Sequence, residues 1–158
     1  MKLFDTNIIV YAYDELEVEK RKKCLSLLQP IFEGKGKGYV TNQILGETFI
    51  VLTKHMKMPS SIEDAKDIIE LFISSNNWVK INYDYKTVKK AVGYVKEFKI
   101  NFWDAVIAAT MIENNISSIY TENEKDFKKI PGINVINPLL TADQDSKTKD
   151  SEKTSKKQ

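Results

Sequence analysis

Cysteine and histidine are almost absent from this chain of 158 residues, which contains one of each, Cys24 and His55. A single cysteine cannot form an internal disulfide, and Cys24 stands in a helical pattern, so we expect it to pack in the core. With one histidine, a ribonuclease site built on a histidine pair is impossible, and zinc sites of the usual His and Cys composition are excluded. A Ser-His-Asp or Cys-His site would need His55, which has no nucleophile motif beside it.

Long hydrophobic runs and a strong excess of one charge are also missing. No apolar run approaches the roughly 20 residues of a membrane-spanning helix, and the N-terminus lacks the pattern of an export signal. We therefore expect a cytoplasmic protein without membrane contact. The 24 basic and 22 acidic residues give a net charge of +2, which is too balanced to indicate nucleic-acid binding by itself. Basic residues gather at 20–23, 86–90 and 125–129, where they also fit the solvent-exposed faces of amphipathic helices.

The apolar pattern of the chain alternates between short strands and helices. This alternation predicts one α/β domain over residues 1–140, a three-layer α/β/α fold with a central parallel sheet of about five short strands. Pro30 is expected to end the first predicted helix, and Ser60 with Glu63 forms a capping-box pattern at the start of a later one. Strands are expected at 1–4, 39–40, 78–81, 118–121 and 134–136, and helices at 17–29, around Glu47, at 62–75, at 84–98, around Asp104 and at 126–127.

Two segments of biased composition lie outside these elements. The glycine-lysine stretch 34–38 lacks the GxxxxGK[ST] spacing of a phosphate-binding loop, so we interpret it as a flexible lead into the next strand. In the segment 141–158 no apolar side chain is larger than that of Ala142, and Ser, Thr, Lys and Asp predominate. Such a segment cannot bury enough apolar surface to offset its ordering entropy, so we expect a disordered polar tail.

Three carboxylates stand in apolar sequence. Asp5 directly follows the first predicted strand, Glu47 lies in an apolar helix, and Asp104 begins another apolar helix. A buried carboxylate is costly unless it is paired or bound to a metal, so these acids predict one cluster assembled by folding. Carboxylate oxygens suit hard Mg²⁺ or Mn²⁺ ions. Taken singly, Asp5 also fits a turn residue, Glu47 an exposed helix residue, and Asp104 a helix cap.

Four motifs, in their order and spacing, resemble those of PIN-domain proteins, and the chain is most similar to the small ribonuclease toxins of the VapC type. The resemblance extends from Met1 to about Leu140. It implies Mg²⁺- or Mn²⁺-dependent cleavage of single-stranded RNA, a small antitoxin protein as partner, and a homodimer. The motifs are LFDTN at 3–7, Glu47 in its helix, WDAVIAA at 103–109 and IYTENEKDF at 119–127.

The resemblance also implies roles for individual residues. Asp5 and Asp104 would be metal ligands, and Glu47 would bind the ion directly or through water. Thr6 would orient the site, and Asn7 would brace the loop by hydrogen bonds.

The fourth acid of the family is replaced in this sequence. It usually lies two residues beyond the threonine that Thr121 resembles, and here that position is Asn123. Asn123 could supply a carbonyl oxygen or orient a water, and Glu122, Glu124 or Asp126 could substitute for it if the loop is shifted.

Functions of other classes stay open at this point. The missing fourth acid leaves room for a non-catalytic RNA-binding protein with the same fold. A housekeeping RNA-processing nuclease, or a metal-dependent hydrolase of a small phosphoester, would use the same acids. Glycosidases also use paired carboxylates.

Overall fold

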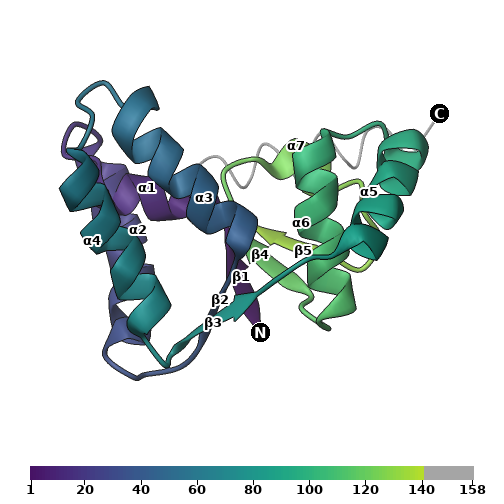
Figure 1. Ribbon diagram of the computed structural model, residues 1–158, viewed down its shortest axis with the longest axis horizontal. Helices are drawn as coiled ribbons and strands as arrows, with labels where there is room; N and C mark the ends of the chain where they lie inside the picture. The colour runs from purple at the N-terminus through teal and green to yellow at the C-terminus, as the bar shows by residue number, and fades with distance from the viewer. Residues whose placement is uncertain (141–158) are drawn as a thin grey trace.

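A parallel five-stranded sheet forms the centre of the part of the chain that the structure describes (Figure 1). The structure is a computed structural model and describes residues 1–140, so the predicted polar tail at 141–158 lies outside the described residues. The strand order is β3-β2-β1-β4-β5. The strands are β1 Lys2–Phe4, β2 Gly38–Thr41, β3 Trp78–Ile81, β4 Ser118–Tyr120 and β5 Asn134–Ile136.

The strand order changes direction in the middle of the sheet, between β1 and β4. In open α/β sheets, ligands bind beyond the carboxyl ends of the strands at such a point. The hydrogen-bond ladder continues past the ends of the two strands, because Asp5 N–H donates to the Tyr120 carbonyl (3.0 Å) and Thr121 N–H to the Ile136 carbonyl (3.0 Å). The backbones of Asp5 and Thr121 are therefore as firmly placed as the strands themselves.

Helices lie on both sides of the strands. Figure 1 shows α1 to α4 on one side and α5 to α7 on the other, so the predicted three-layer α/β/α fold is confirmed. No helix within residues 1–140 is both long and apolar enough to cross a membrane. The helices are α1 Thr6–Tyr13, α2 Val18–Phe32, α3 Asn42–Ile50, the π-helical turn η1 Val51–His55, α4 Ile62–Ser74, α5 Tyr85–Phe98, α6 Phe102–Glu113 and α7 Glu124–Phe127.

The first helix, α1, was not predicted from the sequence. Asp5 is its N-cap, and the Asp5 carboxylate accepts a hydrogen bond from Thr6 N–H (2.8 Å). Ile8, Ile9 and Ala12 of α1 are buried. A helix of eight residues has almost no periodic signal of its own, and packing on its neighbours stabilises it.

One predicted helix boundary and one predicted helix cap were wrong. The helix α2 continues through Pro30 to Phe32, because a proline in the last turn removes only one intrahelical hydrogen bond. The N-cap of α4 is Ser61 rather than Ser60, since the Ser61 hydroxyl accepts a hydrogen bond from Asp64 N–H (3.0 Å).

The core beneath the sheet centre is aromatic and closely packed. The rings of Phe4 and Trp78 meet edge to face, with centroids 5.0 Å apart. At Gly38, where β2 begins, an added Cβ would lie 2.4 Å from the Trp78 ring, so no larger residue fits. Cys24 is fully buried, which confirms its predicted packing role, and burial raises the pKa of its thiol to about 11. This packing holds β1 rigidly behind Asp5.

Candidate active site

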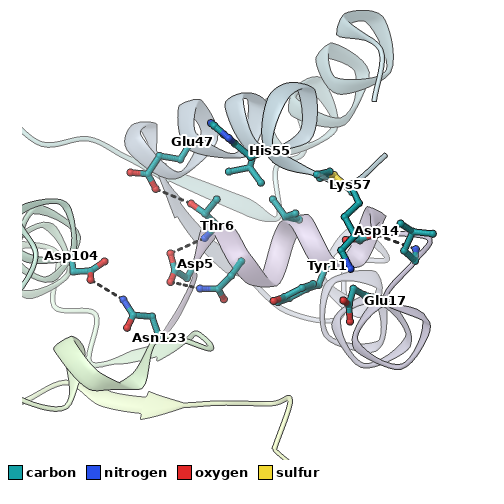
Figure 2. A pocket seen from close by; sticks show the side chains of 15 residues that line it. Asp5, Thr6, Tyr11, Asp14, Glu17, Glu47, His55, Lys57, Asp104 and Asn123 are labelled. Carbon is teal, nitrogen blue, oxygen red and sulfur yellow. Dashed lines mark hydrogen bonds between the residues drawn. The ribbon is translucent and has the colours of Figure 1, made fainter. Parts of the chain in front are cut away.

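The three acids singled out in the sequence lie in one hollow at the carboxyl ends of β1 and β4. The hollow has a volume of about 420 Å³, and Asp5, Glu47, Asp104 and Asn123 all line it. Figure 2 shows Asp104 and Asn123 facing Asp5 across one end, with Glu47 above them. The structure thus brings together side chains from the N-cap of α1, from α3, from α6 and from the loop after β4.

Asp5 is the most firmly held of these acids. Its side chain is buried, and it accepts hydrogen bonds from Thr6 N–H (2.8 Å), Asn7 Nδ2 (2.8 Å) and the Thr121 hydroxyl (2.6 Å). Burial raises the pKa of Asp5, the nearby charge of Glu47 raises it further, and the three hydrogen bonds only partly oppose this. The carboxylate is therefore fixed in position although its negative charge is destabilised.

Thr121 and Asn7 join the loop after β4 to the start of α1. The Thr121 hydroxyl donates to Asp5 and accepts from Asn123 N–H (2.9 Å), and Asn7 Nδ2 also approaches it (3.2 Å). The Asn7 side-chain carbonyl accepts from Glu122 N–H (3.1 Å). Asn7 therefore makes hydrogen bonds of the bracing kind that the resemblance implies, and Thr121 makes contacts of the same kind.

Asp104 lies in the first turn of α6 and is not the cap of that helix. The cap is Asn101, whose side-chain oxygen accepts from Trp103 N–H (2.8 Å). Partial burial raises the pKa of Asp104 to about 7, and the charges of Asp5 and Asp126 contribute to the rise. Without a bound cation, Asp104 therefore holds a proton up to nearly neutral pH.

Asn123 lies against Asp104 and lines the hollow. Its side-chain amide Nδ2 donates to Asp104 Oδ2 (2.8 Å). Among the four candidates for the fourth position, only Asn123 lines the hollow.

Glu122 and Glu124 pair with lysines away from the acids of the hollow, whereas Asp126 interacts both with the start of α6 and with Asp104. Glu122 pairs with Lys20 (2.9 Å), and Glu124 pairs with Lys128. Asp126 accepts from the backbone N–H at the N-cap of α6 (2.8 Å) and lies 3.4 Å from a lysine of its own helix turn. Burial raises the pKa of Asp126, but these two contacts, together with a hydrogen bond to Asp104, hold it below its ordinary value.

Glu47 is held from two sides. Its carboxylate accepts from the Thr6 hydroxyl (3.0 Å) and from Gln43 Nε2 (2.8 Å). Gln43 Nε2 also donates to the Trp103 carbonyl (3.2 Å), so this side chain connects α3 to α6. Gln43 was missed in the sequence, where the only signal is its position four residues before Glu47 on the same helix face.

The acids differ from the sequence prediction in their exposure. Asp5 is buried, with 6% of its surface exposed, whereas Glu47 and Asp104 are only partly buried. The reason is that the apolar sequence around Glu47 and Asp104 faces the core, while the acids themselves face the open hollow.

Further side chains of the hollow were not predicted as site residues. Tyr11, Asp14, His55 and Lys57 line it together with the acids. Tyr11 belongs to the unpredicted helix α1, and its hydroxyl donates to Glu122 (2.6 Å). His55 was weighed in the sequence only as the partner of a nucleophile, because nothing in the sequence shows that its helix end reaches the acids.

The donor set fits a hydrated divalent ion better than a closed metal cage. Within residues 1–140, no three Asp, Glu, His or Cys side chains converge closely enough to hold an ion between them. Mg²⁺ usually binds one or two carboxylates and keeps several waters. Asp5 and Asp104 face the same space, and the charge of Asp5 raises the pKa of Asp104. A divalent cation beside them would relieve this repulsion.

The sequence matches the family model described as "PIN domain" over residues 2–133. This match covers most of the chain, and the protein therefore belongs to the PIN-domain family. Among curated proteins, none shows significant sequence similarity to the chain.

Solved structures with the same fold include several toxin-antitoxin proteins. A toxin-antitoxin complex from Klebsiella pneumoniae is 22% identical, with a TM-score of 0.62 over 87% of this chain and 98% of that one. VapBC2 from Rickettsia felis, bound to a DNA fragment from its promoter, is 22% identical, with a TM-score of 0.61 over 86% and 97%. VapC20 from Mycobacterium tuberculosis, a sarcin-ricin loop cleaving toxin, is 16% identical, with a TM-score of 0.59 over 80% and 92%. At these identities the likeness establishes the fold.

Proposed function

We propose that this protein is a cytoplasmic Mg²⁺- or Mn²⁺-dependent endoribonuclease and the toxin of a toxin-antitoxin pair. The observation that supports the proposal most is the convergence of Asp5, Glu47 and Asp104 in one hollow at the centre of the sheet. Membership of the PIN-domain family adds to it. An acidic hollow repels the RNA backbone, so it is useful to a nuclease only when a cation changes the sign of the local field.

Each acid of the hollow would have its own role in binding the metal ion. Asp5 and Asp104 would hold the ion, and Glu47 would bind it directly or through a water. A bound Mg²⁺ or Mn²⁺ would neutralise charge on the scissile phosphate and activate a water for attack. Thr6 would keep Glu47 turned toward the hollow, through the hydrogen bond that already joins them.

Asn123 would act through its amide. The hydrogen bond from Asn123 Nδ2 holds the Asp104 carboxylate in one orientation. An amide adds no negative charge, so the site has one charge fewer than a four-acid site. We therefore expect cleavage at a higher Mg²⁺ concentration than a fourth carboxylate would require.

The solved neighbours support the choice of partner and substrate. One of them is described as a toxin-antitoxin complex, and the name of another describes a toxin that cleaves the sarcin-ricin loop. By analogy, this chain would act on RNA and would be inhibited by a cognate antitoxin. We also expect a homodimer, which stays a prediction.

Cleavage of RNA by the purified protein tests the proposal. We expect cleavage of single-stranded RNA with Mg²⁺ or Mn²⁺, none with EDTA, and none by the Asp5→Asn and Asp104→Asn variants, which remain folded. Asp67→Asn is the matched control, because Asp67 is exposed on α4 and does not line the hollow. Cleavage that persists in EDTA would exclude the metal mechanism. RNA binding without cleavage would favour the non-catalytic alternative, and activity on a small phosphodiester alone would favour the other hydrolase.

A further inference from the structure

Two basic side chains line the acidic hollow, and the proposed chemistry does not use them. His55 and Lys57 are the only basic residues among those that line it, against five acids. In Figure 2, Lys57 lies at the end that also holds Asp14 and Glu17, away from Asp104 and Asn123. His55 lies beside Glu47 in the same view, so the two bases stand at different places along the hollow.

His55 lies at the end of a π-helical turn. The helix α3 ends in the π-helical turn η1, and Met56 N–H closes this turn on the Val51 carbonyl (3.2 Å). Glu47, Val51 and His55 are spaced by four residues and all line the hollow. If the α-helix continued regularly, His55 would lie about 80° further around the helix axis than Glu47, because each residue of an α-helix turns about 100°. The wider π turn makes this angle smaller, so His55 lies closer to the helix face that carries Glu47. Such π turns occur frequently at functional sites.

The two side chains are also available for a ligand. His55 and Lys57 are exposed, and neither makes a side-chain hydrogen bond or an ion pair with any residue of the described range 1–140. Some lysines of the predicted basic segments, to which Lys57 does not belong, do have partners. Lys20 pairs with Glu122, and Lys129 lies 3.4 Å from Asp126.

We propose that His55 and Lys57 each contact a phosphate of the RNA strand near the scissile phosphate. This inference rests on the proposed function, and it assigns to the π turn the task of placing a phosphate-binding group in the acidic hollow. The Lys57 ammonium supplies a positive charge. The His55 imidazole keeps one N–H donor even when it is neutral. Together they would hold the strand where the neighbouring carboxylates alone would repel it.

A purely structural role for Lys57 leads to different results. Lys57 shares its end of the hollow with Asp14 and Glu17, so it could serve only to offset their charge. Loss of Lys57 would then lower the thermal stability and leave the salt dependence of RNA binding unchanged. A phosphate contact instead changes the salt dependence, because each neutralised phosphate releases counterions.

RNA binding measured without cleavage separates these roles. The probe is a fluorescein-labelled single-stranded uridine decamer, titrated in EDTA with protein carrying Asp5→Asn, at several salt concentrations. We expect Lys57→Gln to weaken binding about fivefold, the size expected of one exposed charge pair, and to reduce the slope of log K against log salt by about 0.7. The matched control is Lys54→Gln, because Lys54 is exposed in the same segment and does not line the hollow.

His55 can be observed directly, because it is the only histidine of the chain. Its imidazole NMR signals are expected to shift on addition of the decamer, and the shift is expected to be smaller in the Lys57→Gln variant. In the otherwise unchanged enzyme, Lys57→Gln should raise KM about fivefold, like the binding constant, and leave kcat unchanged.

The outcomes distinguish this inference from the proposed function. Equal salt slopes for Lys57→Gln and Lys54→Gln, or imidazole signals that do not respond to the decamer, would overturn the phosphate contact whether or not RNA is cleaved. If the protein without any substitution binds the decamer but does not cleave RNA in the presence of Mg²⁺, the proposed cleavage is refuted. In that case a reduced slope for Lys57→Gln would still support the contact.

Discussion

Replacement of Asp104 by asparagine is expected to stabilise the protein when no divalent cation is present. Asp104 has a pKa of about 7 in the folded chain, against an ordinary value of 3.8, because burial and the charge of Asp5 oppose its ionisation. The folded state therefore binds this proton more tightly than the unfolded state. Asparagine has nearly the same shape and no charge, and its side-chain oxygen can still accept the hydrogen bond from Asn123.

The size and the sign of the effect follow from linkage. The full difference between 3.8 and about 7 corresponds to about 4 kcal/mol. Because Asp104 is only partly buried, solvent screening reduces this figure, and we expect a gain of about 1–2 kcal/mol. The free energy of unfolding of the parent should fall as the pH rises from about 4 to about 7, and the variant should lack the part of this fall that Asp104 causes. The gain is therefore present at pH 8 and absent at pH 4.

Urea unfolding in EDTA at pH 4, 6 and 8 measures this difference. Asp67→Asn is again the control, and it should show no gain that grows with pH. Addition of Mg²⁺ should stabilise the parent more than the Asp104→Asn variant, because a ligand that binds only the folded state adds stability by mass action. A variant that is less stable than the parent at pH 8, or equally shifted at all three pH values, would refute the reasoning.

Two further predictions concern the supports of the site and its fourth position. Thr121→Val removes a hydroxyl that donates to Asp5 (2.6 Å), so thermal unfolding should show a loss of about 1–3 kcal/mol, and cleavage should fall; an unchanged melting temperature would show that this bond does not matter. Asn123→Asp places a carboxylate beside Asp104, so the Mg²⁺ concentration at half-maximal cleavage should fall, whereas Asp126→Ala should change it little. An effect of Asp126→Ala without an effect of Asn123→Asp would assign the fourth position to Asp126. If neither variant changes the Mg²⁺ dependence, this loop takes no part in metal binding.

The fold and the three acids could be predicted from the sequence because both depend on local pattern. Short apolar runs separated by helical periodicity predict a parallel sheet, and an acid directly after a strand predicts a side chain at the sheet edge. Asp5 illustrates this, because its position follows from the end of β1 alone. The family resemblance rested on the order of such motifs, and the match to the family model confirms it.

The contacts that shape the site could be found only in the tertiary structure. Thr6 meets Glu47 across 41 residues of chain, and Asp5 meets Thr121 across 116. Asn123, rather than Asp126, lies in the hollow because the β4 backbone is paired on both sides, while Asp126 is held at the start of α6.

His55 shows the same division between sequence and structure. The sequence by itself determined that the chain has one histidine near the end of a helix. Only the π turn and the packing of α3 against α1 decided that this histidine lines the acidic hollow. The physical reason is that helix phase and helix packing are set by side chains distant in sequence, which no local pattern records.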